Sequence, residues 1–350
     1  MRNRTCEIFK IDKMRIALCT IAKSENRYIK EFVSYYKTLG VDVIYLYDNN
    51  DTDGECFEDV IGDEIASGFV KLHDYRGRKV GQLDAYRDCY AKYSASADWM
   101  MFFDVDEFLT FSPTSNMSSV KEYLGQEKFS SYNMIHINWM CFGDNEKLYY
   151  EEGDVIKRFP APLPYTQCVS FDRPENDTIK SILRCGNEVR WIKSVHTPQY
   201  VKDVNCCDNK GQKVDDVYSD TLNMDFTEAY LRHYSTKTAE EYALKLIRGF
   251  ADQHVDMEKM RFLIECRFFA TNKKTVQKIE ILRKALPALY EDYGMSFIER
   301  LLFRGDVSMF GYSDIQRLRI YKLLRLNKLL IGIGALGMVL CIVVLLWVIL

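Results

Sequence analysis

Three acidic residues interrupt an otherwise apolar segment, residues 99–111, which reads WMMFFDVDEFLTF. The acids are Asp104, Asp106 and Glu107, and charged groups are costly to bury unless something compensates their charge. The simplest compensator is a divalent cation, because Mg²⁺ and Mn²⁺ take carboxylate oxygens and bind phosphates at the same time. The segment therefore predicts a buried strand that ends at a metal–diphosphate site. The alternative is a strand that ends in a solvated acidic turn, which the apolar flanks disfavour.

The elements that would position these acids alternate between strand and helix. Apolar residues at helical spacing from Tyr28 to Leu39 predict a helix with Ser24 as its N-cap and Gly40 at its end, and residues 82–93 predict another helix. Short apolar runs predict buried strands at residues 15–21, 41–47, 69–73 and 99–103. This alternation is typical of a parallel sheet covered by helices.

Polar residues follow several of these strands. Residues 20–25 come at the end of the first strand, Asp48 ends the second, and Asp104 and Asp106 follow the fourth. Ligands of such sheets collect at the carboxyl ends of the strands, so these groups are expected to share one edge. Neither G-x-G-x-x-G nor a Walker A sequence is present, which disfavours a dinucleotide site and a P-loop. The basic segment 76–81 either faces a diphosphate or is a solvated loop.

Composition excludes some classes of function. The chain has 350 residues, enough for one large domain or two modest ones, and its net charge of −3 gives no general attraction to nucleic acid. Its eleven cysteines contain no C-x-x-C and no zinc spacing, which indicates reduced, mostly buried thiols.

The second half of the chain begins with further strands. Strands are expected at residues 133–142, 180–184 and 189–196, followed by a polar surface loop at 200–222. Thr238 and Glu241 have the spacing of a capping box, which predicts a helix that ends near Gly249. From there to about residue 310 the pattern is helical.

The C-terminus predicts a membrane span. Residues 329–350 form 22 consecutive positions without a charge, about 33 Å as a helix, close to the hydrocarbon thickness of a bilayer. Basic residues precede it, and residues 313–328 are expected to lie as a basic amphipathic segment on anionic headgroups. Positive flanks stay on the cytoplasmic side. We therefore expect a single-pass tail anchor with the preceding domain in the cytoplasm, in a bacterial inner membrane.

Several sequence blocks together resemble a known family of enzymes. The run CTIAKSENRYIKEFVSYYKTLGVDVIYLYDNNDTDG at 19–54, followed by FFDVDEF, NWMCFGDN, KSILR, SVH and HYSTKTAEEYALKLIRG, is similar to glycosyltransferases of the family 2 and family 92 kind. The resemblance covers roughly residues 14–250. It implies a GT-A fold, a Rossmann-like mixed sheet flanked by helices, with a nucleotide-sugar donor, UDP-linked, and Mn²⁺ or Mg²⁺.

The sequence patterns and the resemblance together divide the chain into four parts. Residues 14–235 would be the GT-A catalytic domain and 236–312 a helical extension. Residues 313–328 would be the juxtamembrane segment and 329–350 the transmembrane anchor.

The resemblance also assigns roles to the acidic residues and histidines. Asp106 would be the direct metal ligand, Asp104 would reach the metal or the ribose, and Glu107 would support them. His196 is the first candidate for a further metal ligand and His233 the second. The alternative for either histidine is a hydrogen-bonded residue inside the fold.

Other residues would hold the donor. Asp48 would contact the nucleoside, and Thr20 and Glu25 the base and ribose. Gln82 and Asp84 would face the diphosphate or donor sugar. The alternatives are a turn-forming Asp48, a Glu25 that favours its helix N-terminus, and ordinary first-turn polarity at 82 and 84.

An inverting transfer also needs a base, for which Asp144 is the candidate; its alternative is a turn residue in Gly-Asp-Asn. Lys237, Lys245 and Arg248 would contact phosphate or an anionic acceptor, or else form a solvated helix face. The expected function is metal-dependent, inverting sugar transfer to a glycan or lipid-linked acceptor in cell-surface polysaccharide synthesis. The alternatives are a nucleotidyltransferase, disfavoured by the glycine-free first loop, and a non-catalytic membrane-anchored scaffold.

Overall fold

A computed structural model of the chain describes residues 13–163, 169–170, 173–174, 178–187, 189–190, 194–200, 205–214 and 224–290. The chain forms two compact units, one that ends at Leu286 and one that begins at Pro287. The predicted juxtamembrane segment and membrane span lie outside the described residues and stay predictions. Within the described residues, no helix is both long and apolar enough to cross a membrane.

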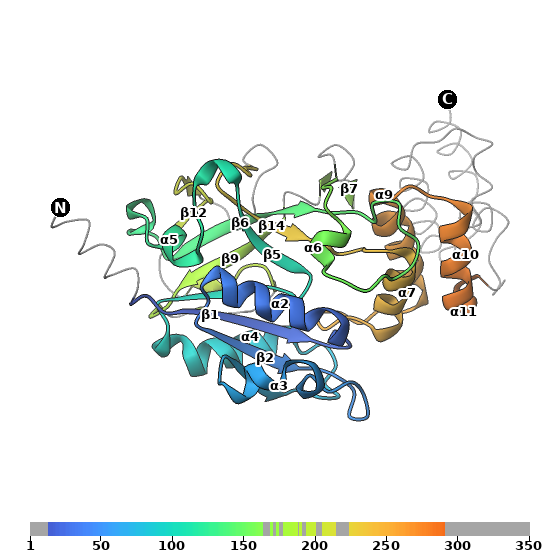
Figure 1. The fold of residues 1–350 in the computed structure, drawn as a ribbon, viewed down its shortest axis with the longest axis horizontal. Helices are drawn as coiled ribbons and strands as arrows, with labels where there is room; N and C mark the ends of the chain where they lie inside the picture. The colour runs from blue at the N-terminus through green and yellow to red at the C-terminus, as the bar shows by residue number, and fades with distance from the viewer. Residues whose placement is uncertain are drawn as a thin grey trace, which may run out of the picture. The chain divides into compact units, whose positions relative to one another are not determined.

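The first half of the chain is a parallel sheet in the order β3-β2-β1-β4. These strands are β1 (Ile16–Ala22), β2 (Val43–Asp48), β3 (Val70–Asp74) and β4 (Trp99–Phe102). All residues of β1, β2 and β4 are buried, as the apolar runs predict. The four predicted strands are therefore confirmed, and the carboxyl ends of β1 and β4 meet at one edge because these strands are parallel neighbours. Strands β1 and β2, also parallel neighbours, lie side by side in Figure 1.

Helices cover both faces of this sheet. The helices are α2 (Asn26–Leu39), α3 (Glu58–Ala66) and α4 (Gln82–Tyr93). Alternate residues of β1 point to opposite faces. Leu18 packs in one apolar cluster with Phe32 of α2, whereas Cys19 packs in the other with Tyr86 of α4. The two central layers of the core therefore lie on either side of β1.

The predicted ends of α2 are half right. Gly40 adopts the left-handed conformation (φ 96°) and returns its amide to the last turn, so it ends the helix as predicted. The N-cap residue is Glu25, so the prediction of Ser24 as the N-cap was wrong. Ser24 has φ 51°, and its amide donates to Asn50 Oδ1 at 2.7 Å, so it belongs to the loop before the helix.

The second half of the chain converts the sheet to a mixed one. The strands are β5 (Glu107–Phe111), β6 (Met134–Cys141), β9 (Ile179–Arg184) and β14 (Ala229–His233). Strand β9 runs antiparallel between β4 and β6. Strand β14 pairs parallel with β6 and antiparallel with β5, so that His233 faces Glu107 across the ladder. The sequence did not predict β5 or β14, and together they bring the chain after Asp106 beside His233.

Shorter elements complete the structure. The predicted surface loop at 200–222 contains two short strands that extend the sheet beyond β6, so that prediction was wrong for them. In the predicted strand at 189–196, residues 189–190 are a strand, residues 194–196 are not, and the rest lies outside the described residues. The remaining short elements of this region are η1 (Ser94–Ser96), η2 (Pro113–Ser115), α5 (Val120–Leu124), η3 (Glu127–Phe129), α6 (Val155–Arg158), β7 (Val169–Ser170), β8 (Arg173–Pro174), β10 (Val189–Arg190), β11 (Gln199–Tyr200), β12 (Cys206–Cys207) and β13 (Lys213–Val214).

Helix α7 (Ala239–Arg248) begins with the predicted capping box, because Thr238 and Glu241 each bond the other's backbone amide. Helix α10 (Val276–Ala285) packs on α7. The helices are otherwise α8 (Met257–Leu263), the π-helical turn η6 (Ile264–Phe268), α9 (Phe269–Thr271) and, in the second unit, α11 (Pro287–Tyr290). The predicted boundary at residue 235/236 stays a prediction, although the compact unit that holds the sheet continues to Leu286.

Candidate active site

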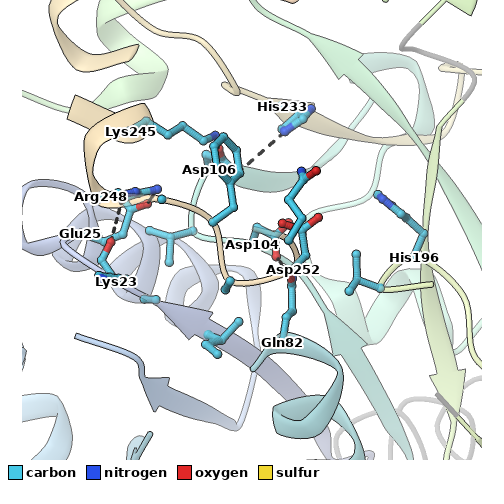
Figure 2. A pocket seen from close by; sticks show the side chains of 18 of the residues that line it. Lys23, Glu25, Gln82, Asp104, Asp106, His196, His233, Lys245, Arg248 and Asp252 are labelled. Atoms are coloured by element: carbon cyan, nitrogen blue, oxygen red, sulfur yellow. Dashed lines mark hydrogen bonds and ion pairs between the residues drawn. The ribbon is translucent and has the colours of Figure 1, made fainter. Parts of the chain in front are cut away.

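A pocket opens at the carboxyl ends of β1 and β4, where ligands of parallel sheets usually bind (Figure 2). Segments far apart in sequence supply its walls: the end of β1 and the β1–α2 loop, the start of α4, the turn after β4, β6, residues 195–196, β14, the end of α7 with the loop after it, and η6. Its charged and polar lining residues are Lys23, Glu25, Gln82, Asp104, Asp106, His196, His233, Lys245, Arg248, Asp252, Gln253 and Arg267. The structure thus brings together six of the residues that sequence analysis singled out for donor or metal binding, together with the phosphate candidates Lys245 and Arg248: Glu25, Gln82, Asp104, Asp106, His196 and His233.

Both carboxylate oxygens of Asp104 are held by neighbours. Gln82 Nε2 donates to Oδ1 at 2.7 Å, and the Tyr86 hydroxyl donates to the same oxygen at 3.2 Å. Lys180 Nζ donates to Oδ2 at 2.9 Å from the adjacent strand β9. Asp104 is therefore fixed in orientation at the pocket wall. Gln82 both lines the pocket and helps to hold Asp104 in place.

Lys180 is a cation inside the sheet. Its side chain is 0% exposed, and its ammonium also lies 3.5 Å from Glu107 Oε2. Burial raises the pKa of Glu107 well above its usual range, against the opposing pull of Lys180. Glu107 Oε2 accepts the amide of Asp104 at 2.9 Å, so Glu107 supports the turn that carries the acids, in agreement with the supporting role expected for it.

Asp106 is buried, with 8% of its side chain exposed. Lys245 Nζ donates to its Oδ2 at 2.8 Å, and His233 Nε2 lies 3.9 Å from its Oδ1 (Figure 2). Burial acts to raise the pKa of Asp106, but Lys245 and His233 hold it well below its usual range. Asp106 is therefore an anion at the floor of the pocket.

Lysines, rather than a metal alone, compensate the acidic segment. Lys180 pairs with Asp104 and Lys245 pairs with Asp106, so each of these acids has a lysine partner, while the expected divalent cation stays a prediction. Across the described residues, no three His, Cys, Asp or Glu side chains lie close enough to hold one ion. Two atoms that could bind a metal ion do face each other, Asp106 Oδ1 and His233 Nε2. Mg²⁺ and Mn²⁺ suit such a pair, because they commonly take one or two protein ligands and fill their shell with water and phosphate oxygens.

The two candidate histidines have different surroundings. Both pack against Trp139, with ring centroids 3.8 Å away for His233 and 5.2 Å for His196. His196 Nδ1 bonds the Ile179 carbonyl at 3.0 Å, and burial, with the charge of Lys180, lowers its pKa to about 3. His233 is the histidine that meets Asp106, so the geometry favours the second sequence candidate over the first.

Helix α7 supplies two cations of the pocket, Lys245 and Arg248. Lys245 and Arg248 are only 16% and 19% exposed. Arg248 pairs with Glu25 at 2.5 Å and donates to the carbonyls of Lys23 and Ser24. These two side chains therefore point inward, which contradicts their reading as a solvated helix face.

Lys237 is also buried, but it is not a lining residue. Its ammonium lies 4.4 Å from the centroid of the Tyr28 ring. It precedes α7 with a positive φ of 50°, an uncommon conformation for a lysine. Its charge adds to the cations that lower the pKa of Asp106.

Thr20 and Asp48 do not line the pocket. Thr20 is buried in β1, and its hydroxyl has no partner within the described part of the chain. Asp48 accepts from Arg76 Nε at 2.8 Å and from the Asn50 amide at 3.0 Å, so it organises the turn after β2. Arg76 of the basic segment thus binds the β2 end rather than facing solvent alone.

Asp84 and Asp144 also lie outside the lining. Asp84 is exposed and pairs with Arg87 one turn along α4. Asp144 forms a buried ion pair with Lys278 of α10, its amide donates to Asn272 Oδ1 at 2.7 Å, and its Oδ1 accepts the Glu146 amide. Asp144 is thus a turn residue bound to α10, in line with the alternative reading, and it is not among the lining residues of this pocket; its role as a base stays a prediction.

Sequence analysis missed Asp252. It lies in the loop after α7, which is tied to α4 because the Gln82 amide donates to the Ala251 carbonyl at 3.1 Å. Partial burial of its carboxyl against the pocket wall and the repulsive charge of Asp104 both raise the pKa of Asp252, although the residue as a whole is exposed. No sequence signal marks it, because an isolated Asp in a polar loop is unremarkable.

A pocket at the carboxyl ends of the strands is where sheets of this kind bind their ligands, and comparison with known sequences identifies the family. The model of glycosyltransferase family 92 matches residues 13–274. The chain therefore belongs to glycosyltransferase family 92, as the sequence resemblance predicts.

Two similar proteins come from plants. A rice (Oryza sativa subsp. japonica) family 92 protein, Os08g0121900, is 27% identical over 105 residues, 30% of this chain and 18% of that protein. The Arabidopsis thaliana galactan beta-1,4-galactosyltransferase GALS3 is 28% identical over 167 residues, 44% of this chain and 32% of that protein. The matched region thus spans about a third or less of these relatives.

Among solved structures, the chain is similar to Staphylococcus aureus TarS 1–349, with a TM-score of 0.34 and 11% identity over 79% of this chain and 80% of that one. The complex of the same protein with UDP-GlcNAc gives a TM-score of 0.32 and 10% identity over 79% and 81%.

Proposed function

We propose that this protein transfers a sugar from a nucleotide sugar, UDP-linked, to a hydroxyl of a glycan or lipid-linked acceptor, with inversion and with Mn²⁺ or Mg²⁺, on a GT-A-type sheet. One observation carries the proposal. Asp106 lies at the floor of the pocket with His233 Nε2 3.9 Å from one carboxylate oxygen and Lys245 2.8 Å from the other.

The charges around the pocket suit a departing diphosphate. When the bond between the sugar and the diphosphate breaks, negative charge develops on the β-phosphate, and fixed positive groups stabilise it as it forms. Lys245 and Arg248 lie on one face of α7, at positions three residues apart, and both line the pocket. A metal bound between Asp106 and His233 would supply further Lewis-acid stabilisation of the same charge.

Asp104 suits a different task. Because Lys180, Gln82 and Tyr86 already engage both its oxygens, it is held in place as a hydrogen-bond acceptor at the wall. A ribose or sugar hydroxyl is the donor group that such a carboxylate would accept. The galactan galactosyltransferases among the relatives favour a hexose donor and a polysaccharide acceptor.

The test is turnover of UDP-glucose, UDP-galactose and UDP-N-acetylglucosamine with Mn²⁺, followed as UDP release, for the wild type, Asp106→Asn and Asp63→Asn. Asp63 is an exposed residue of α3 and serves as the matched control. Asp106→Asn is expected to lose at least about 100-fold in turnover, the size typical of a lost electrostatic group in an active site. Full turnover by Asp106→Asn would refute the proposed role of this pocket.

Attachment to a membrane is a separate proposal, which rests on the apolar stretch 329–350 alone. A membrane-bound transferase and a lipid-linked acceptor would meet in one plane. The predicted cytoplasmic orientation and bacterial host stay predictions.

A further inference from the structure

Four carboxylate side chains line the pocket, and three of them have a cation of their own. Arg248 pairs with Glu25, Lys180 with Asp104 and Lys245 with Asp106. Asp252 is the fourth, and among the residues that the structure describes no cation forms an ion pair with it. A carboxylate that is already neutralised by a lysine or arginine is a poor proton acceptor, because the cation stabilises the anion.

Asp252 also stands where an acceptor can reach it. The residue is exposed, whereas Glu25 and Asp106 are buried at the pocket floor. Its loop begins at Gly249, whose φ of 80° lets the chain turn sharply away from α7. The bond from the Gln82 amide to the Ala251 carbonyl fixes this loop to the helix that carries Gln82. Figure 2 shows Asp252 with Gln82 and Asp104 among the side chains that line the pocket.

Asp144 offers the contrast. Its carboxylate is buried against Lys278, and neither residue lines the pocket. The sequence indicated Asp144 as the general base, so a base that acts in this pocket has to be another residue. Among the pocket carboxylates, Asp252 alone combines exposure with the lack of a cation partner in the described chain.

We propose that Asp252 is the general base of the transfer, an inference that rests on the proposed function. Its carboxylate takes the proton from the acceptor hydroxyl while that oxygen bonds to the anomeric carbon. The bond from this carbon to the diphosphate oxygen breaks, and its electron pair leaves with the diphosphate. Asp252 ends protonated and returns the proton to solvent through its exposed side, which completes the cycle.

The experiment compares Asp252→Asn, Asp252→Ala, Asp106→Asn and Asp63→Asn by UDP release from the UDP-sugar that the wild type turns over fastest. UDP affinity is measured by calorimetry on the same proteins. Asp252→Asn is expected to lower kcat about 100- to 10,000-fold, the usual contribution of a general base, while UDP affinity stays within about threefold. Asp63→Asn is expected to match the wild type in both.

A second measurement separates a base from a structural residue. Azide attacks the anomeric carbon without giving up a proton, so it needs no base. Sodium azide is therefore expected to raise the turnover of Asp252→Ala at least about tenfold, with a glycosyl azide as product. It is not expected to raise the turnover of Asp106→Asn.

Three outcomes would overturn the inference while leaving the proposed function standing: kcat of Asp252→Asn within about threefold of wild type, loss of UDP affinity in proportion to turnover, or no azide rescue of Asp252→Ala. In each case the wild type still turns over a UDP-sugar and Asp106→Asn does not. Absence of turnover by the wild type with every UDP-sugar, without UDP binding, would overturn the proposed function and this inference with it.

Discussion

The ammonium group of Lys180 lies 2.9 Å from Asp104 Oδ2, although no part of the Lys180 side chain is exposed to solvent. A buried cation is costly unless its partners compensate it, and removal of one partner leaves the others uncompensated. Lys180 therefore contributes both to the stability of the sheet and to the orientation of Asp104 in the pocket wall.

Lys180→Met is expected to lower the free energy of unfolding by about 3–5 kcal/mol, because Asp104 and Glu107 then lack their cation. Urea unfolding measures this. Lys92→Met is the control, since Lys92 is exposed and pairs with Asp88 on the surface of α4; it should cost less than about 1 kcal/mol. Lys180→Met with Glu107→Gln should recover part of the loss, because the double variant no longer buries an uncompensated carboxylate at position 107. If the double variant were no more stable than Lys180→Met, this account of Glu107 would be wrong.

Glu241 anchors the start of α7 through a pH-sensitive pair. Arg158 donates to both its carboxylate oxygens at 3.1 and 2.8 Å, and the Tyr28 hydroxyl donates at 2.8 Å. Burial acts to raise the pKa of Glu241, but Arg158 and Lys237 lower it below its ordinary value. A carboxyl with a lowered pKa in the folded state stabilises the fold above its unfolded pKa, about 4.3. That contribution disappears as the pH falls through the folded pKa.

Glu241→Gln is accordingly expected to cost about 3 kcal/mol at pH 7, with the difference from wild type shrinking below about pH 4. Urea unfolding at pH 7, 5, 4 and 3 follows it. Glu280→Gln, which removes an exposed pair with Arg283, should change stability by no more than about 0.5 kcal/mol at each pH. A difference for Glu241→Gln that stayed constant from pH 7 to pH 3 would contradict the ion-pair explanation.

Substitution of the two histidines is expected to change the Mn²⁺ dependence of UDP-sugar turnover to different extents. EDTA is expected to abolish UDP-sugar turnover and Mn²⁺ to restore it. Because His233 Nε2 lies 3.9 Å from Asp106, His233→Gln should raise the Mn²⁺ concentration for half-maximal turnover about tenfold or more. His196→Gln should change it less than about threefold, since His196 is bound to the Ile179 carbonyl. The opposite ranking of the two variants would restore His196 as the ligand.

Removal of residues 329–350 is expected to release the protein from membranes. The full chain should sediment with membranes after a high-salt wash, because about 33 Å of apolar helix spans the hydrocarbon. The shortened chain should stay in the supernatant and keep UDP-sugar turnover, since the pocket lies within the unit that ends at Leu286. Sedimentation of the shortened chain after the wash would show that another segment holds the protein to the membrane.

The sequence predicted the parts of the fold that local patterns determine. The runs around Leu18 and Met101 are apolar on both faces, so they could only be buried strands. Gly40 and the Thr238–Glu241 box are local end signals, and both were read correctly. Strands β5 and β14 were missed because EFLTF and AYLRH are short and mix charge with apolar residues. Their pairing joins residues more than a hundred positions apart, which no local pattern records.

The same distinction applies to the site. Asp104 and Asp106 were found because acids inside an apolar run are conspicuous. Lys180 carried the same kind of signal, a charge within the apolar strand KSILR, but it was read only as part of a strand. His233 and Asp252 reach the pocket through β14 and the loop after α7, so their roles depend on tertiary pairing. Asp48 and Asp144 sit at strand ends as expected, yet Arg76 and Lys278 bind them away from the pocket.

The spacing of side chains along helix α7 limits where this region can accept insertions. Glu241, at its first turn, is fixed by Arg158, whereas Lys245 and Arg248 follow at intervals of four and three residues on the same face. Insertion of one residue after Glu241 would rotate the rest of the helix by about 100°. Both cations would then leave Asp106 and Glu25 while the helix stayed capped and folded. Length variation among natural homologues should therefore avoid the seven-residue interval from 241 to 248 and accumulate in the loops on either side.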